Sequence, residues 1–135
     1  MSRKVAREYA YKLVFEFLFS NATNSRTYQL FSCADLDEKD VEYLENVYFG
    51  IAKKYDELIN VVSEFSHGFN IDRIYKTDLS ALLIAIYEMK YIDDIPLSVS
   101  INEAVILVKK YSTDKSNSFV NGILSSVYKS LTTQE

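Results

Sequence analysis

The stretch SFVNGIL, residues 118–124, decides how the C-terminal part of the chain folds. Its apolar residues and those that follow repeat at the spacing of one buried helix face: Val120, Ile123, Leu124, Val127 and Leu131. Gly122 lies inside this run, although a glycine in a helix costs about 1 kcal/mol relative to alanine. The chain has only three glycines. We therefore predict a helix in which Gly122 lets a neighbouring helix backbone approach closely.

Helical spacing of apolar residues extends from this stretch back to the N-terminus, and no segment shows convincing strand alternation. The spacing predicts helices at about residues 5–18 and 26–34. The next helical region begins at residue 35 or 37 and runs to 65, with a bend near 54–56. Three more helices follow: one from residue 72 or 77 to 89, one from 98 or 100 to 108, and one at 115–130. The segment 79–89 is apolar nearly all round, so we expect its helix to be central. The prediction is an all-α fold with about seven helices.

The size and composition of the chain fit a globular protein. We assign residues 1–135 to a single domain, because this length supports one sizeable core. No apolar stretch is long enough to cross a bilayer, and the N-terminus lacks the apolar segment of a signal peptide. Cys33 is the single cysteine and cannot form an internal disulfide, which fits a reducing compartment. We expect a cytoplasmic protein without membrane contact.

Positive charge is concentrated at the N-terminus of an otherwise acidic chain. Residues 1–12 hold four Lys or Arg and one Glu, a net charge of +3; the other 123 residues hold eleven Lys or Arg and eighteen Asp or Glu, a net charge of −7. Arg3, Lys4 and Arg7 fall beside the apolar stripe of the first helix, so we expect them to share an exposed face. This asymmetry is typical of a protein with a polyanionic partner, although a solvated helix face has the same pattern.

The residues that carry catalysis or bind metals are scarce. The chain has no phosphate-binding glycine loop and no paired cysteines, and His67 is its single histidine. Glu88 and Glu103 could be taken for a catalytic carboxylate pair, but a partly exposed helix charge and a helix cap explain them more simply. We predict that the protein is not an enzyme and needs neither a cofactor nor a metal.

Residues 96–124, PLSVSINEAVILVKKYSTDKSNSFVNGIL, closely resemble the signature of the NusB family of bacterial transcription antitermination factors. The segment IAIYEM (84–89), the DIP turn (94–96) and A-R-E (6–8) match the same family in the same order. The resemblance implies two small helical bundles packed across each other and no enzymatic activity. It also implies binding of the boxA element of ribosomal-RNA transcripts together with NusE, a small-subunit ribosomal protein, in a complex that joins other Nus factors on RNA polymerase.

The resemblance assigns roles to individual residues. Arg3, Lys4 and Arg7 would hold the RNA backbone, although relatives often have a denser arginine cluster there. Phe119, and with it Phe69, would meet RNA bases, whereas the position of Phe119 beside the apolar stripe leaves it open whether its ring belongs to the core. Lys115 lies one helical turn before Phe119, at a position that is often acidic in relatives, and adds a phosphate contact.

The protein partner and two alternative functions also follow from the resemblance. Phe15 and Asp78 take positions that the family uses to contact NusE, and the acidic body would attract such a basic protein. One alternative is a helical protein-interaction scaffold whose partner alone contacts RNA. Another is a relative of the RNA-binding domain of ribosomal-RNA cytosine methyltransferases. The absence of a methyltransferase domain after the last helix of this sequence counts against that alternative. Some relatives form homodimers, and the sequence leaves that possibility open.

Overall fold

The computed structural model describes residues 3–34, 36–68 and 70–133. These residues form seven α-helices and one short 3-10 helix, and they contain no strand, so the all-α prediction is confirmed. The elements are α1 (Arg3–Ser20), α2 (Ser25–Ser32), α3 (Glu38–Lys53), α4 (Tyr55–Phe65), η1 (Ile71–Arg73), α5 (Lys76–Tyr91), α6 (Leu97–Tyr111) and α7 (Ser116–Thr133). The predicted bend near residues 54–56 is the break between α3 and α4.

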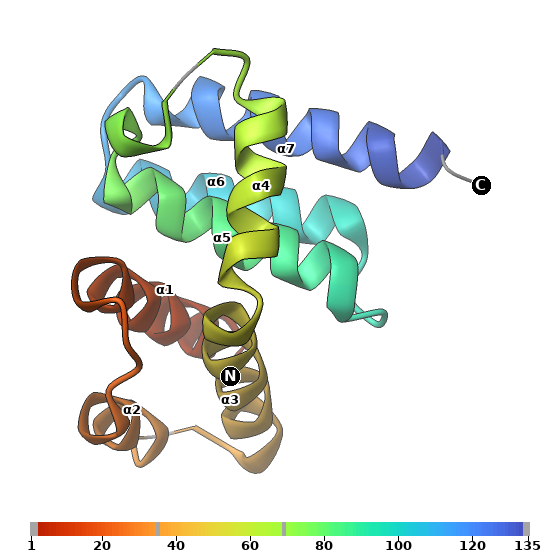
Figure 1. Cartoon of the computed structure of the whole chain (residues 1–135). Coiled ribbons are helices and arrows are strands. Elements are labelled where there is room, and N and C mark those ends of the chain that lie inside the picture. Colours follow the sequence, from red (N-terminus) through yellow and green to blue (C-terminus); the bar gives the residue numbers. More distant parts are fainter. Residues whose placement is uncertain (1–2, 35, 69, 134–135) are drawn as a thin grey trace.

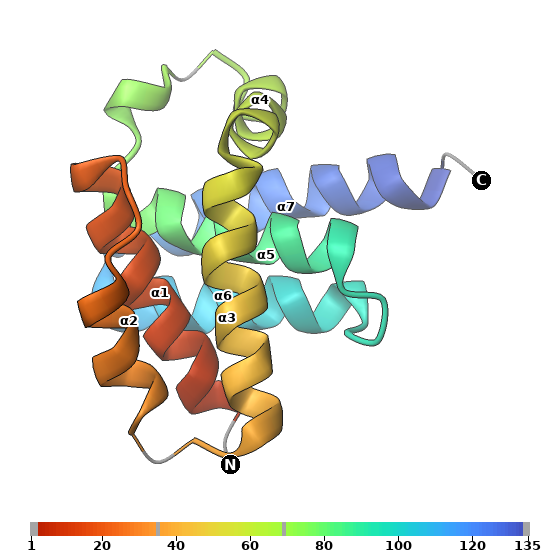
Figure 2. The same cartoon turned by 60° about the horizontal axis from the view of Figure 1, so that its bottom comes forward.

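The helices form two groups that pack across each other, as the family resemblance implies. Helices α1, α2 and α3 lie side by side in one group, and α4 to α7 form the other (Figures 1 and 2). Helix α5 contacts α4, α6 and α7 of its own group and also α1 and α3, so it joins the two groups. Helices α1 and α6 run in the same direction (Figure 1), and the ion pairs Lys4–Glu103 and Lys110–Glu8 connect them.

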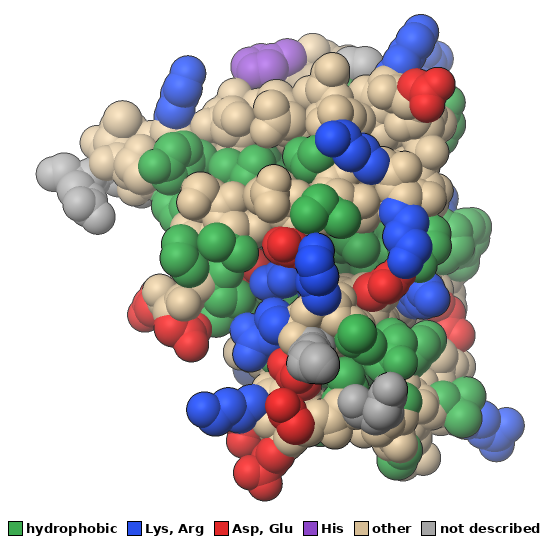
Figure 3. Space-filling model, turned by 180° about the vertical axis from the view of Figure 1, so that it is seen from behind, with side chains coloured by type: hydrophobic (Ala, Val, Ile, Leu, Met, Phe, Trp, Pro, Cys, Tyr) green, Lys and Arg blue, Asp and Glu red, His purple; other side chains and the backbone are tan. Residues whose placement is uncertain are grey.

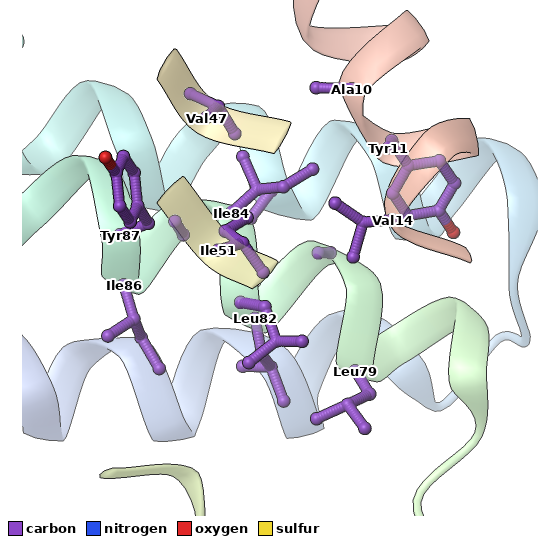
Figure 4. Close-up of a cluster of buried hydrophobic side chains, with 14 of the residues drawn as sticks. Ala10, Tyr11, Val14, Val47, Ile51, Leu79, Leu82, Ile84, Ile86 and Tyr87 are labelled. Carbon is purple, nitrogen blue, oxygen red and sulfur yellow. The ribbon is translucent and has the colours of Figure 1, made fainter. Parts of the chain in front are cut away.

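The core is centred on α5. Every residue from Asp78 to Met89 is buried, which confirms the prediction of a central helix. Figure 4 shows that Ile84 of this helix points toward Val14 of α1 and Val47 of α3, whereas Leu82 and Ile86 point the other way, toward α7. Burial on all sides explains why this segment carries apolar residues nearly all round rather than on one face.

Two glycines have opposite surroundings. A Cβ atom added at Gly122 would meet nothing within 4 Å, so the predicted close helix approach at this residue is wrong. The exposed side of α7 carries Gly122, and the apolar residues predicted from SFVNGIL form its buried side. The glycine in close contact is Gly50 of α3, where an added Cβ would lie 2.7 Å from Tyr87 Cε1 and closer still to its hydroxyl.

In residues 3–34, 36–68 and 70–133, no helix is long and apolar enough to cross a bilayer. In the same residues, no group of three or more His, Cys, Asp or Glu side chains is arranged so that it could hold a metal ion.

Candidate nucleic-acid interface

The arginine of the A-R-E segment lies inside the molecule. Arg7 is 4% exposed, and its Nε and Nη2 atoms donate hydrogen bonds to Glu88 Oε2 and Oε1 at 2.8 and 3.3 Å. Glu88 itself is 0% exposed. The predictions of an exposed Arg7 and a partly exposed Glu88 are therefore wrong. The physical reason is that α1 packs on α5, and Arg7 falls within the stripe of α1 that faces it.

Glu88 connects four helices through the hydrogen bonds that it accepts. The Tyr43 hydroxyl of α3 donates to Oε2, and Ser100 Oγ of α6 donates to Oε1 at 2.7 Å, in addition to the bonds from Arg7 of α1. Burial and the nearby Glu88 carboxylate raise the pKa of Tyr43 well above its ordinary value, so the hydroxyl remains a donor. A buried charge is tolerated only when it is paired and hydrogen-bonded, and this network meets both conditions.

The other two basic residues of the predicted N-terminal cluster, Arg3 and Lys4, are on the surface, and each lies beside a carboxylate. Arg3 Nε is 3.3 Å from Asp40 Oδ1 of α3, and its guanidinium carbon is 4.4 Å from the centre of the Tyr43 ring. Lys4 Nζ is 3.4 Å from Glu103 Oε1 of α6. Figure 3 accordingly shows Lys and Arg side chains interspersed with Asp and Glu rather than a uniform basic surface.

Two more charged side chains, which the sequence analysis did not assign to the site, continue this arrangement between α1 and α6. Lys110 Nζ of α6 is 2.8 Å from Glu8 Oε2 of α1, and the Tyr111 hydroxyl also donates to Glu8. We call Lys4, Glu8, Glu103 and Lys110 the α1–α6 seam. The four residues alternate in charge, so the seam has no net charge despite the basic N-terminal sequence.

Asp78 lies at the junction of α5, α6 and α7. Ser112 Oγ donates to Asp78 Oδ1 at 2.6 Å, and Ser116 Oγ donates to Ser112 Oγ at 2.9 Å. Since Asp78 is buried and bonded in this way, its position does not support the predicted contact with a partner protein. The carboxylate instead fixes the end of α6 and the start of α7 against α5.

Phe15 is half-buried and remains available for the predicted partner contact. Its ring packs edge-on against Phe19 with 5.0 Å between the ring centres. Together with Tyr11, Lys12, Thr77 and Tyr111, it lines an apolar hollow of about 320 Å³ between α1, α5 and α6. Phe15 is eleven residues beyond Lys4, about 16 Å along the helix axis at 1.5 Å per residue. The two predicted sites on α1 are therefore separate.

Lys115 and Phe119 mark the start of α7. Lys115 is exposed immediately before the helix, and Phe119, one turn later, is half-buried and packs against the core. The ring is thus neither a fully buried core residue nor a fully exposed one, and its contact with RNA stays a prediction. Phe69, the other aromatic residue predicted to meet bases, lies outside the described residues.

The sequence model of the NusB family matches residues 4–129. The chain belongs to the NusB family. It is 43% identical over 132 residues to the transcription antitermination protein NusB of Acetivibrio thermocellus, which covers 96% of this chain and 90% of that protein. Identity to the NusB of Finegoldia magna is 36% over 130 residues, covering 96% and 95% of the two chains.

Solved structures agree with this assignment. The NusB of T. maritima has the same fold, with a TM-score of 0.86 and 27% identity over 96% of this chain and 92% of that one. The NusB proteins of Acetivibrio thermocellus and Finegoldia magna are both named as transcription antitermination proteins. Family membership therefore confirms the resemblance drawn from residues 96–124.

Proposed function

We propose that the protein is a transcription antitermination factor that binds boxA-type single-stranded RNA of ribosomal-RNA transcripts together with NusE. The complex would join other Nus factors and keep RNA polymerase elongating in the cytoplasm. Membership of the NusB family supports the general role. The observation that carries the RNA-binding proposal is the exposed Lys115 followed one helical turn later by the half-exposed ring of Phe119.

The two residues supply the two kinds of contact that single-stranded RNA requires. An ammonium group on the surface pairs with a phosphate, and an aromatic ring stacks on an unpaired base. Arg3 and Lys4, at the start of α1, are further phosphate contacts in the proposal, and Phe69 is a second aromatic contact. Arg7 is left out as a direct contact, because its guanidinium is buried against Glu88.

For the protein partner we propose the hollow lined by Phe15. The hollow is apolar and aromatic, which suits an apolar side chain of NusE. The net charge of −7 outside residues 1–12 favours approach of a basic ribosomal protein.

The test is a titration of boxA-type RNA with and without NusE, using Phe119→Leu and Lys115→Ala. Leucine retains most of the packing volume but cannot stack, so Phe119→Leu should leave the melting temperature nearly unchanged and cost about 1–3 kcal/mol of binding. Lys115→Ala should reduce the slope of log affinity against log salt by about 0.7, the value for one single-strand phosphate contact.

The matched controls are Tyr128→Leu and Lys129→Ala, which change an exposed ring and a lysine further along the same helix. We expect both to bind RNA like the unaltered protein. Unchanged RNA affinity in Phe119→Leu would contradict the proposed stacking contact.

The second candidate is a protein-interaction scaffold, which the acidic body and the Phe15 hollow favour. In that case Phe15→Ala would abolish NusE binding, RNA would bind only when NusE is present, and Phe119→Leu would have no effect. Sedimentation of the free protein would show at the same time whether it forms the homodimer that some relatives form.

A further inference from the structure

The α1–α6 seam consists of two ion pairs that share one geometry. In each pair a lysine lies on the outside and a carboxylate lies beneath it. The side chains of Lys4 and Lys110 are 67% and 60% exposed, whereas those of their partners Glu103 and Glu8 are 17% and 23% exposed. Both pairs border one hollow of about 140 Å³, and Arg7 forms part of its wall.

We propose that Glu8 and Glu103 compete with RNA phosphates for Lys110 and Lys4, so that the seam binds nucleic acid only as these two ion pairs open. The inference rests on the proposed function, because it concerns the same RNA. Glu8 and Glu103 thus lower the affinity for RNA, and binding depends more strongly on the contacts at α7 and on the partner protein.

The competition follows from the chemistry of the groups. A phosphodiester and a carboxylate each offer negatively charged oxygens to the same ammonium donor, so one lysine does not fully satisfy both. Hydrogen bonds from Lys110 and Tyr111 lower the pKa of Glu8, which therefore stays ionised at neutral pH. An open pair would also leave Glu8 facing the phosphates, and like charges repel.

The ion pair of Lys110 and Glu8 is not needed for the fold. Exposed pairs between lysine and a carboxylate contribute little to stability. The buried pair of Arg7 and Glu88 already joins α1 to α5, and Ser100 joins α6 to the same carboxylate. Loss of Glu8 should therefore leave the molecule folded, and RNA affinity can be compared directly.

The chain contains a matched control for Glu8. Glu57 of α4 accepts hydrogen bonds from Lys90, at 2.8 Å, and from Tyr91. This is the same combination of an adjacent lysine and tyrosine that Glu8 has in Lys110 and Tyr111. Glu8→Gln and Glu57→Gln make the same change in net charge and break the same kind of triad, but only Glu8 lies on the seam.

The experiment measures the affinity of Glu8→Gln, Glu103→Gln and Glu57→Gln for boxA-type RNA. The salt concentration is about 0.1 M, at which screening does not abolish the attraction within an ion pair. Glu8→Gln and Glu103→Gln should each tighten binding about 2- to 5-fold, the range that corresponds to one exposed ion pair. Glu57→Gln should bind like the unaltered protein. In a Lys110→Ala background the gain from Glu8→Gln should disappear, because no lysine remains to be released.

Equal affinities of Glu8→Gln and Glu57→Gln would overturn the inference. So would a gain from Glu8→Gln that persists without Lys110, since the carboxylate would then act by general repulsion. The same variants are titrated with tripolyphosphate, followed by the NMR shifts of the Lys110 ammonium group. If no variant binds RNA, the proposed function fails, and the order of the variants with tripolyphosphate still decides the inference.

Discussion

Replacing Glu88 by glutamine removes one negative charge from the centre of the molecule while keeping the volume of the side chain. The carboxylate accepts hydrogen bonds from Arg7, Tyr43 and Ser100 and has no exposed surface. Glutamine has one acceptor oxygen in place of two, and its amide nitrogen would face donors. The Arg7 guanidinium would keep only the Glu103 carboxylate, whose Oε1 is 3.7 Å from Nη1.

The expected loss of stability is large. Breaking a buried ion pair by removing one partner costs about 3–5 kcal/mol, because the remaining charge is left without compensation. For a chain of this size, such a loss corresponds to a fall in melting temperature of about 10–20 °C. The pKa of Arg7 is raised: burial acts to lower it, but Tyr43, Glu88 and Glu103 together favour the cation. The residue therefore stays charged rather than adapting by loss of its proton.

Urea unfolding followed by circular dichroism measures the effect. Glu57→Gln is the control, because its pair with Lys90 is on the surface and should cost less than about 1 kcal/mol. The double variant Arg7→Met, Glu88→Gln should be more stable than Glu88→Gln alone, since methionine removes the unpaired cation and retains apolar contacts. A loss below about 1 kcal/mol in Glu88→Gln, or no recovery in the double variant, would refute the reasoning.

Further predictions concern the glycines and the tyrosines. Gly50→Ala should destabilise the protein by about 1–3 kcal/mol, because its Cβ would overlap the buried ring of Tyr87. Gly122→Ala should raise the melting temperature, since about 1 kcal/mol of helix propensity is gained in open space. Burial raises the pKa of Tyr43, so above about pH 10 the unfolded chain loses this proton while the folded one keeps it. Stability should therefore fall as the pH rises past about 10, and urea unfolding between pH 8 and 11 should show a shallower fall in Tyr43→Phe.

Most of the fold could be predicted from the sequence, because a helix is visible in the local spacing of its apolar residues. The burial of α5 is visible in the apolar run 79–89, and the break between α3 and α4 in the interruption near residue 54. The roles of the glycines could not be predicted in the same way. Gly50 is required by a ring 37 positions further along the chain, a contact that no local pattern records.

The candidate site was predicted less well, because charge counted along a sequence does not show where each charge is paired. A signal was nevertheless present for the buried pair. Arg7 lies between Ala6 and Ala10 in the apolar rhythm of the first helix, and Glu88 lies in a segment that is apolar on every side. Two opposite charges that each occupy a buried helix face must pair, since an isolated buried charge is too costly.

The two charged side chains of the A-R-E segment, Arg7 and Glu8, therefore point in opposite directions. Arg7 points inward and fixes α1 against α3, α5 and α6 through Glu88, and the neighbouring Glu8 points outward to Lys110. Because the buried network sets the position of α1 relative to α6, it also sets the distances between the charges of the seam. Glu88→Gln should consequently reduce stability and alter RNA binding only through the fold. Glu8→Gln should change RNA affinity in a molecule that is as stable as before.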